Sequence, residues 1–392
     1  MEEFRTVTNP PPQGGARDSS PLPCSNLPRY SSPAEAVLLQ ITTSNLVSIL
    51  KWARCLVGWM TMGYLGFLAL ILLALERWGE RNWLISVLLY APPQILLLPL
   101  VIMAPACLLF RPRLIGWHLA AAFFLIFGYM NFRWSRPARQ GSTTVTAVTF
   151  NAGESNLPQF LEFLDREKPD FVFLQDTGGR ALAVKARLPG ASMVSLGQFC
   201  FISRYPLEKM SYVEAAKSGD QPVAVRCETV IAGRPAALYS VHLPTPRSEL
   251  SRFLGGRRIL GDLAGRAHRE AGFGNYRDWL AARLNLARSL AGVFAKEPLP
   301  MIVGGDFNTP DHGYIYHLFA GEMTDAFAHA GRGWGLTFPG STHNPVSFYG
   351  PWLRIDYFFA GRGWNVSECR PEPGRKSQHK AVLARFEPTP IH

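Results

Sequence analysis

The sequence predicts a chain of two parts, an N-terminal region of three membrane-spanning helices and a C-terminal α+β domain. The first part is predicted by three long apolar runs between residues 46 and 134. The second is predicted by short strand-like runs after residue 143 that carry polar side chains at their ends. A chain of 392 residues is long enough for one large domain and an additional region.

Residues 1–45 are expected to form a disordered tail. The tail is low in complexity, with Pro10-Pro11-Pro12 and Gly14-Gly15, and such a composition buries too little apolar surface to fold. Within it, the run Ser31-Ser32-Pro33-Ala34-Glu35 can cap a short helix that leads to the membrane. A cleavable signal peptide is not expected, because the first apolar run begins only near residue 55.

The three apolar runs of the region 46–134 are residues 55–75, 83–110 and 114–132. Each is about 20 residues or longer, enough to cross a hydrocarbon core of roughly 30 Å. A single run could be a buried helix of a soluble protein, but three in succession with tryptophans near their ends favour a membrane. The middle run contains several prolines, so a kink is expected. Its alternative is re-entry on the same side of the membrane.

Basic residues near the spans predict the orientation. Arg111 and Arg113 form the short loop after the second run, and Lys51 and Arg54 precede the first. Because cytoplasmic loops are enriched in Lys and Arg, three spans place the C-terminal domain outside the cytoplasm. We therefore expect a multi-pass protein of the inner membrane. If the second run only re-enters, the domain faces the cytoplasm instead.

Residues 135–142 are predicted to be a linker to the C-terminal domain. The chain is basic, with a formal net charge of +11, and Arg257 and Arg258 belong to an arginine-rich, glycine-containing segment that predicts a mobile loop. Such a loop can follow a nucleic-acid backbone or lie against anionic headgroups. The alternative is a solvated loop without a ligand. The six cysteines lack Cys-x-x-Cys spacing, which argues against a structural zinc site.

The segment Gly304-Gly305-Asp306-Phe307-Asn308 is the most informative motif of the C-terminal domain. It follows an apolar run, so a buried strand is predicted to end in a tight glycine turn and to present Asp306 and Asn308. Side chains two residues apart in extended chain point the same way. A carboxylate and an amide can then face one phosphate, which suits a hard metal ion and water attack. The alternative is a turn that only caps a helix.

Other strand-like runs of the domain carry a polar group at or near one end. These groups are Asn151, Asp176, His242, Asp356 and His379. A sheet can bring such groups together in one cleft.

In this order the segments resemble the endonuclease/exonuclease/phosphatase superfamily over residues 143–387. The resemblance is carried by Gly-Asp-Phe-Asn, Arg-Ile-Asp-Tyr and a late Ser-x-His. It implies a four-layer α/β sandwich, in which two mostly antiparallel sheets pack together with helices outside. The superfamily includes deoxyribonucleases, apurinic endonucleases and sphingomyelinases, so the resemblance also implies hydrolysis of phosphoric esters.

The resemblance implies roles for individual residues. Asn151 and Asp176 would hold or neighbour the divalent metal, Mg²⁺ or Mn²⁺. His242 would contact the scissile phosphate. Asp306 would orient or deprotonate the attacking water, and Asn308 would bind a phosphate oxygen.

Asp356 would pair with His379, whose imidazolium would balance charge on the phosphoryl oxygens. The chain departs from the family at two positions: Asp176 replaces the usual glutamate, and Gln378 replaces the usual aspartate before His379. Gln378 can still ligate a metal but contributes no charge. The altered site leaves open a degenerate module that binds phosphate-bearing ligands without hydrolysis.

The expected function is a membrane-anchored, divalent-metal-dependent phosphodiesterase. Arg257, Arg258 and Trp334 are the candidate substrate-binding residues, because basic and aromatic side chains suit a polyanion. A nuclease-like activity on nucleic acid is weakly favoured over a lipid phosphodiesterase or a phosphatase of the same fold. No protein partner is expected.

Overall fold

The computed structural model describes residues 33–135, 144–153, 155–254, 276–343, 345–374 and 376–389. The chain divides into two compact units, residues 1–54 and 55–392. The first helix, α1 (Pro33–Arg77), begins in the first unit. Residues 33–45, expected to be disordered, are therefore helical. Most of the expected linker and both Arg257 and Arg258 lie outside the described residues.

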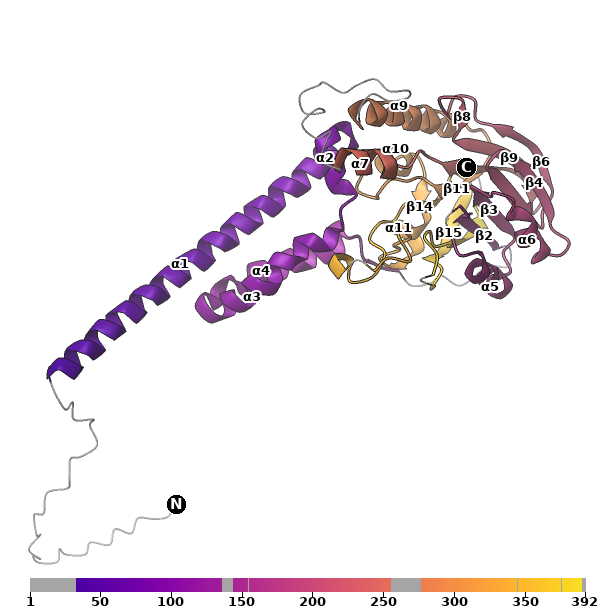
Figure 1. Ribbon diagram of the computed structural model, residues 1–392. Helices are drawn as coiled ribbons and strands as arrows, with labels where there is room; N and C mark the ends of the chain where they lie inside the picture. Colours follow the sequence, from indigo (N-terminus) through magenta and orange to yellow (C-terminus); the bar gives the residue numbers. More distant parts are fainter. Residues whose placement is uncertain are drawn as a thin grey trace, which may run out of the picture. The chain divides into compact units, whose positions relative to one another are not determined.

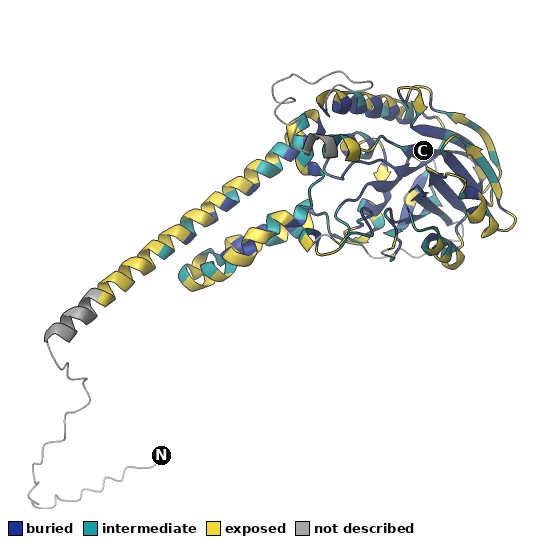
Figure 2. Cartoon of the chain, in the orientation of Figure 1, coloured by how far each residue is buried: buried dark blue, intermediate teal, exposed yellow. Residues whose placement is uncertain are grey.

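The described part of the chain has three helical segments that are long and apolar enough to cross a membrane: Thr42–Arg77, Pro93–Phe110 and Pro112–Tyr129. The first belongs to α1. The second and third are built from η2 (Pro93–Leu97), α3 (Leu98–Phe110), η3 (Pro112–Leu114), α4 (Ile115–Phe123) and the π-helix η4 (Phe124–Tyr129). Many of their apolar side chains are exposed, as Figure 2 shows along α1, and such a surface suits lipid rather than water. The predicted region of three apolar helices is confirmed.

The second apolar run is divided, which differs from the single kinked span that was predicted. Residues Trp83–Leu89 form a separate short helix, α2, after η1 (Gly79–Arg81), and the apolar helix proper begins only at Pro93. The break has a physical reason, because proline lacks the N–H that would continue a helix. Helix α2 instead packs on the C-terminal domain, in a cluster of Trp83, Val87, Leu250, Tyr276, Trp279 and Leu280.

The C-terminal domain contains two six-stranded sheets. The first has the order β15-β16-β2-β3-β5-β4 and the second the order β12-β14-β11-β10-β9-β6. In each sheet one pair is parallel, β2–β3 and β10–β11, and the other pairs are antiparallel. The strands are β2 (Val145–Asn151), β3 (Phe171–Gln175), β4 (Ser192–Leu196), β5 (Phe199–Ser203), β6 (Leu207–Tyr212), β9 (Ala224–Ile231), β10 (Arg234–His242), β11 (Met301–Asp306), β12 (Thr324–Asp325), β14 (Asp356–Ala360), β15 (Trp364–Pro371) and β16 (Val382–Pro388).

The sheets pack face to face, and helices cover their outer faces (Figure 1). Strand β2 shows the pattern: Val145 and Ala147 enter the core between the sheets, whereas Val148 and Phe150 pack toward the outer helices. The outer layers contain α5 (Leu157–Glu167) and α6 (Ala181–Ala186) on one side and α9 (Tyr276–Ala295) and α10 (Tyr314–Ala320) on the other. The predicted four-layer sandwich is confirmed.

The remaining elements are short. A ribbon of β1 (Arg133–Trp134) and β13 (Arg332–Gly333) ties the segment after the third apolar helix to the domain. The others are β7 (Lys217–Ser218), β8 (Gln221–Pro222), α7 (Arg247–Leu254), α11 (Ala326–Ala330) and η5 (Pro345–Ser347).

Candidate active site

The polar residues predicted from the strand ends meet where the central strands of the two sheets end. Strand pairing places Asn151 opposite Gln175 in the first sheet. In the second sheet it places Asp306 beside His242 on one neighbouring strand and Asp356 on the other. The packing of the sheets brings these strand ends together, since Asn151 Nδ2 donates to Asp306 Oδ2 over 2.8 Å.

The two glycines of the central motif serve a different purpose from the tight turn that was predicted. Gly304 and Gly305 lie inside strand β11. A Cβ on Gly305 would overlap the Val241 carbonyl, and one on Gly304 would overlap the Phe358 ring. The glycines therefore permit close packing of β11 against its neighbours, and the turn follows after Asp306.

Asp306 is the fully buried hub of the site. Its Oδ1 accepts from the Asn308 backbone N–H at 2.9 Å, and its Oδ2 accepts from Asn308 Nδ2 at 3.1 Å. Asn308 reaches Asp306 through a turn with φ of 49° rather than along an extended strand. Asn308 Nδ2 also donates to the Leu243 carbonyl. In this geometry Asn308 supports Asp306 instead of presenting its amide to a phosphate.

His379 lies against two carboxylates. Its Nδ1 is 3.2 Å from both oxygens of Asp356 and 3.7 Å from Asp306 Oδ2. Burial raises the pKa of the Asp356 carboxyl above its ordinary value, and the neighbouring His379 acts in the opposite direction. The Phe338 ring lies 4.8 Å from the imidazole. Asp356 and Phe338 thus fix the imidazole from two sides.

His242 is oriented by a residue that the sequence did not single out. Its Nδ1 lies 2.6 Å from Gln198 Oε1, and its Nε2 lies 3.7 Å from Asp306 Oδ2. Gln198 belongs to the turn between β4 and β5, where a polar residue carries no distinctive signal. Beneath these groups, Gln175 joins the two sheets by donating to Ser240 Oγ at 2.8 Å.

These residues line a cavity of about 400 Å³. Six predicted residues are in its wall: Asn151, Asp176, His242, Asp306, Asn308 and His379. Asp356 lies behind His379. Thr245, Arg247, Ser248 and Phe338 complete the lining.

The wall contains a set of oxygens that fits a hard divalent cation. A Cβ on Gly153 would overlap Asp176 Oδ2 and would lie 3.3 Å from Asn151 Oδ1. A carboxylate and an amide oxygen therefore converge on one small space that glycine leaves open. Oxygen ligands of this kind are those that Mg²⁺ prefers.

Two predicted residues lie elsewhere. Gln378, predicted to be a metal ligand, is not in the cavity wall, and its Oε1 instead accepts from Ser341 Oγ at 2.9 Å. Trp334, predicted to bind substrate, packs against Phe132 with ring centroids 5.0 Å apart, beside the third apolar helix. Its aromatic side chain is used at the junction with the membrane region rather than in the cleft.

A buried ion pair between Glu80, from the region of apolar helices, and Arg283, from α9, supports the catalytic segment, which we define as residues 306–311. Glu80, from the connection after α1, is fully buried, contacts Thr309 Oγ1 and accepts from the Ile315 N–H at 2.8 Å. Glu80 Oε1 lies 3.5 Å from the guanidinium of Arg283, which donates to the Phe307 and Asn308 carbonyls at 3.1 and 2.7 Å. A glutamate in the short charged stretch between two apolar runs gave no sign of this role.

A second buried arginine contacts the same segment. Arg354 lies 2.6 Å from Asp325 and 3.1 Å from Asp311. Asn131, which follows the third apolar helix, also donates to Asp311 at 3.0 Å.

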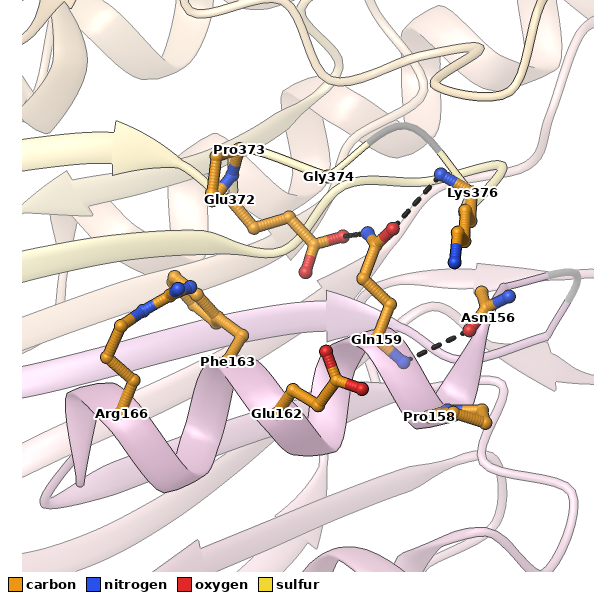
Figure 3. A pocket seen from close by; sticks show the side chains of 10 residues that line it. All are labelled: Asn156, Pro158, Gln159, Glu162, Phe163, Arg166, Glu372, Pro373, Gly374 and Lys376. Carbon is orange, nitrogen blue, oxygen red and sulfur yellow. Dashed lines mark hydrogen bonds between the residues drawn. The ribbon is translucent and has the colours of Figure 1, made fainter.

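A separate cavity of about 390 Å³ lies between α5 and the segment that leads to His379 (Figure 3). Gln159 connects its walls, donating to Glu372 at 2.7 Å and accepting from the Lys376 N–H at 3.0 Å. Glu372 Oε2 is buried without a hydrogen-bond partner among the described residues. Burial raises the pKa of Glu372 to about 7.

Comparison with known proteins identifies one family. The sequence profile of the Endonuclease/Exonuclease/phosphatase family matches residues 148–379, more than half of the chain. The chain is similar to an endonuclease/exonuclease/phosphatase from Bacteroides vulgatus, with 18% identity, a TM-score of 0.43, and coverage of 63% of this chain and 100% of that one. It is also similar to the human Nocturnin catalytic domain with bound sulfate, with 16% identity, a TM-score of 0.41, and coverage of 63% and 94%. No curated protein matches the chain.

Proposed function

We propose that this chain, which belongs to the endonuclease/exonuclease/phosphatase family, is a membrane-anchored phosphodiesterase that uses a divalent metal ion. The observation that carries the proposal is the convergence of Asp306, Asp356 and His379, whose ligand-type atoms lie within 4.8 Å of one another. A carboxylate and an imidazole at a cavity wall, with a second carboxylate behind the imidazole, can move a proton and balance the charge of a phosphoryl group.

In the proposed reaction a water molecule attacks phosphorus and transfers a proton to Asp306. The water oxygen forms a bond to phosphorus, the bond from phosphorus to the leaving oxygen breaks, and the leaving oxygen takes a proton from solvent. Asn151 and Asn308 orient the Asp306 carboxylate through the hydrogen bonds given above. His379, held by Asp356, balances negative charge on the phosphoryl oxygens.

Enzymes of this family generally use divalent metal ions. Asp176 and Asn151 would hold Mg²⁺ or Mn²⁺ here, because their oxygens converge beside Gly153. A bound ion supplies a Lewis acid for the phosphoryl oxygens. Gln378 is outside the cavity wall, so its lack of charge bears less on catalysis than its sequence position suggests. This placement favours hydrolysis over the non-catalytic binding module.

The test is the variant Asp306→Asn in the full-length protein purified in detergent. We expect turnover of bis(p-nitrophenyl) phosphate with Mg²⁺ or Mn²⁺ to fall by roughly 10²–10⁴-fold, because the base is removed. Asp220→Asn, the same change at an exposed turn residue, serves as the matched control and should retain activity. Equal turnover in the Asp306 variant and the control would refute the assignment.

We also propose that the C-terminal domain lies outside the cytoplasm. The connections that touch this domain, at Tyr90 and Tyr129, lie at one end of the α3–α4 hairpin. Arg111 and Arg113 lie at its other end, and basic loops stay in the cytoplasm. A reporter that is active only in the periplasm, fused after the domain, should therefore be active. Activity of a cytoplasmic reporter alone would reverse the orientation.

A further inference from the structure

A second, mainly apolar cavity adjoins the catalytic cavity. It has a volume of about 190 Å³ and shares Thr245, Arg247, Asn308 and Phe338 with the catalytic wall. A ligand whose phosphoryl group occupies the first cavity can therefore extend directly into the second. We call this second cavity the apolar subsite.

The chemistry of the apolar subsite selects a hydrocarbon group. Its distinctive walls are Leu250, Trp352, Leu353 and Ile355. Two of its polar side chains are engaged within the protein, since Trp352 Nε1 donates to the Tyr90 carbonyl at 3.1 Å and Tyr90 Oη lies 3.2 Å from Arg283 Nη1. Asn308 Nδ2 is directed at Leu243 and Asp306. A nucleobase would find few groups to pair with, whereas an alkyl chain needs none.

The apolar subsite is built partly by the membrane region. Tyr90 belongs to the connection between α2 and the helical segment that begins at Pro93. Its neighbour in the wall, Trp352, follows the turn that carries the exposed side chains of Phe348 and Tyr349. This turn follows η5, which packs on η2 at the start of that segment. Aromatic side chains at such a position are typical of a membrane–water interface.

We propose that the substrate is a phosphoester of a membrane lipid, with its phosphoryl group in the catalytic cavity and the first part of an acyl chain in the apolar subsite. This inference rests on the function proposed above. A cavity of about 150 Å³ with apolar walls can hold a benzene molecule, so the subsite accommodates a segment of one chain rather than a complete tail. The weak preference for nucleic acid loses support, because Trp334 lies away from the cavity.

The test compares water-soluble substrates that differ only in acyl length, using the full-length protein in detergent. Dibutyryl and dihexanoyl phosphatidylglycerol are measured below their aggregation concentrations, with bis(p-nitrophenyl) phosphate and plasmid DNA alongside. Each buried methylene contributes about 0.8 kcal/mol, so kcat/KM is expected to rise roughly fourfold for each methylene that enters the apolar subsite.

The variant Leu250→Asp should flatten this dependence on chain length, because it places a charge in the subsite wall. Leu182→Asp is the matched control, since Leu182 is exposed on α6 and lines neither cavity, and it should keep the dependence. If Leu250→Asp does not fold, the comparison of the two acyl lengths in the unaltered protein still tests the inference.

The outcomes separate the two proposals. Hydrolysis of the soluble diester with no rise along the acyl series, or preferred cleavage of DNA, overturns the lipid inference and leaves the phosphodiesterase standing. Failure to hydrolyse any of the four compounds overturns both. A rise along the series that Leu250→Asp removes and Leu182→Asp keeps supports the inference.

Discussion

Two buried arginines support the catalytic segment, and they differ in the origin of their negative partners. Arg354 is paired with Asp325 and Asp311, both from the C-terminal domain. The carboxylate beside Arg283 is Glu80, from the connection after the first apolar helix. Both guanidiniums are almost completely buried. Both charges of the Arg354 support therefore belong to the domain, whereas the Arg283 support takes its carboxylate from the region of apolar helices.

The largest effect is expected for Glu80→Gln. The variant leaves Arg283 buried with only neutral partners, which costs about 3–5 kcal/mol of the free energy of unfolding. Because Arg283 holds the Phe307 and Asn308 carbonyls, kcat should also fall roughly tenfold or more. Thermal unfolding and turnover of the full-length protein measure the two effects.

A double variant provides the control for this prediction. Glu80→Gln combined with Arg283→Gln removes both charges, so it should regain much of the lost stability. If the single variant unfolds at the same temperature as the unaltered protein, the Glu80–Arg283 pair does not stabilise the fold.

An intermediate, pH-dependent effect is expected for Glu372, whose hydrogen-bond donor is an amide, Gln159, rather than an arginine. Burial raises the pKa of Glu372 from 4.5 to about 7, so in this window the folded state keeps a proton that the unfolded state releases. The free energy of unfolding must then fall by about 3 kcal/mol in total as the pH rises from about 4.5 to 7.

Glu372→Gln should abolish this contribution, and melting temperatures from pH 5 to 8 measure it. The profile of the variant should be flatter than that of the unaltered protein. Two parallel profiles would show that Glu372 ionises normally.

The smallest effect is expected for Asp325→Asn. The amide nitrogen takes the place of the oxygen that accepts from Arg354 and Tyr316. Asp311 nevertheless remains beside Arg354, and the amide oxygen can still accept from the Phe327 and Ala328 N–H groups. The expected cost is about 1–2 kcal/mol in the same unfolding experiment. If Asp325→Asn lowers the free energy of unfolding as much as Glu80→Gln does, the Arg354 and Arg283 supports do not differ in the way proposed.

The fold and much of the site followed from local sequence patterns. Asn151, His242 and Asp306 each close an apolar strand-like run, and such runs show which strand end a polar group occupies. Residues whose role depends on distant partners left no such pattern. Glu80 resembled a solvated charge because Thr309 is 229 residues away in the sequence. Gln198 resembled an ordinary turn residue for the same reason.

The sequence also failed to predict the separate helix α2 and the position of Trp334, because composition alone does not show what an apolar residue packs against. An apolar helix that faces lipid and one that packs on protein have similar residues, so α2 could not be separated from the following span. An aromatic residue such as Trp334 can serve a cleft or a domain junction equally well. Only its packing against Phe132 decides between them.

The pairing of Glu80 also has a consequence for biosynthesis. A ribosome that adds roughly 5–20 residues per second needs about 10–45 s to travel from Glu80 to Thr309. During this interval the first apolar helix is already made, while the groups that will enclose the glutamate do not yet exist. The carboxylate of Glu80 must therefore stay in water during this interval, and its buried ion pair forms only when the last third of the chain has folded onto the first third.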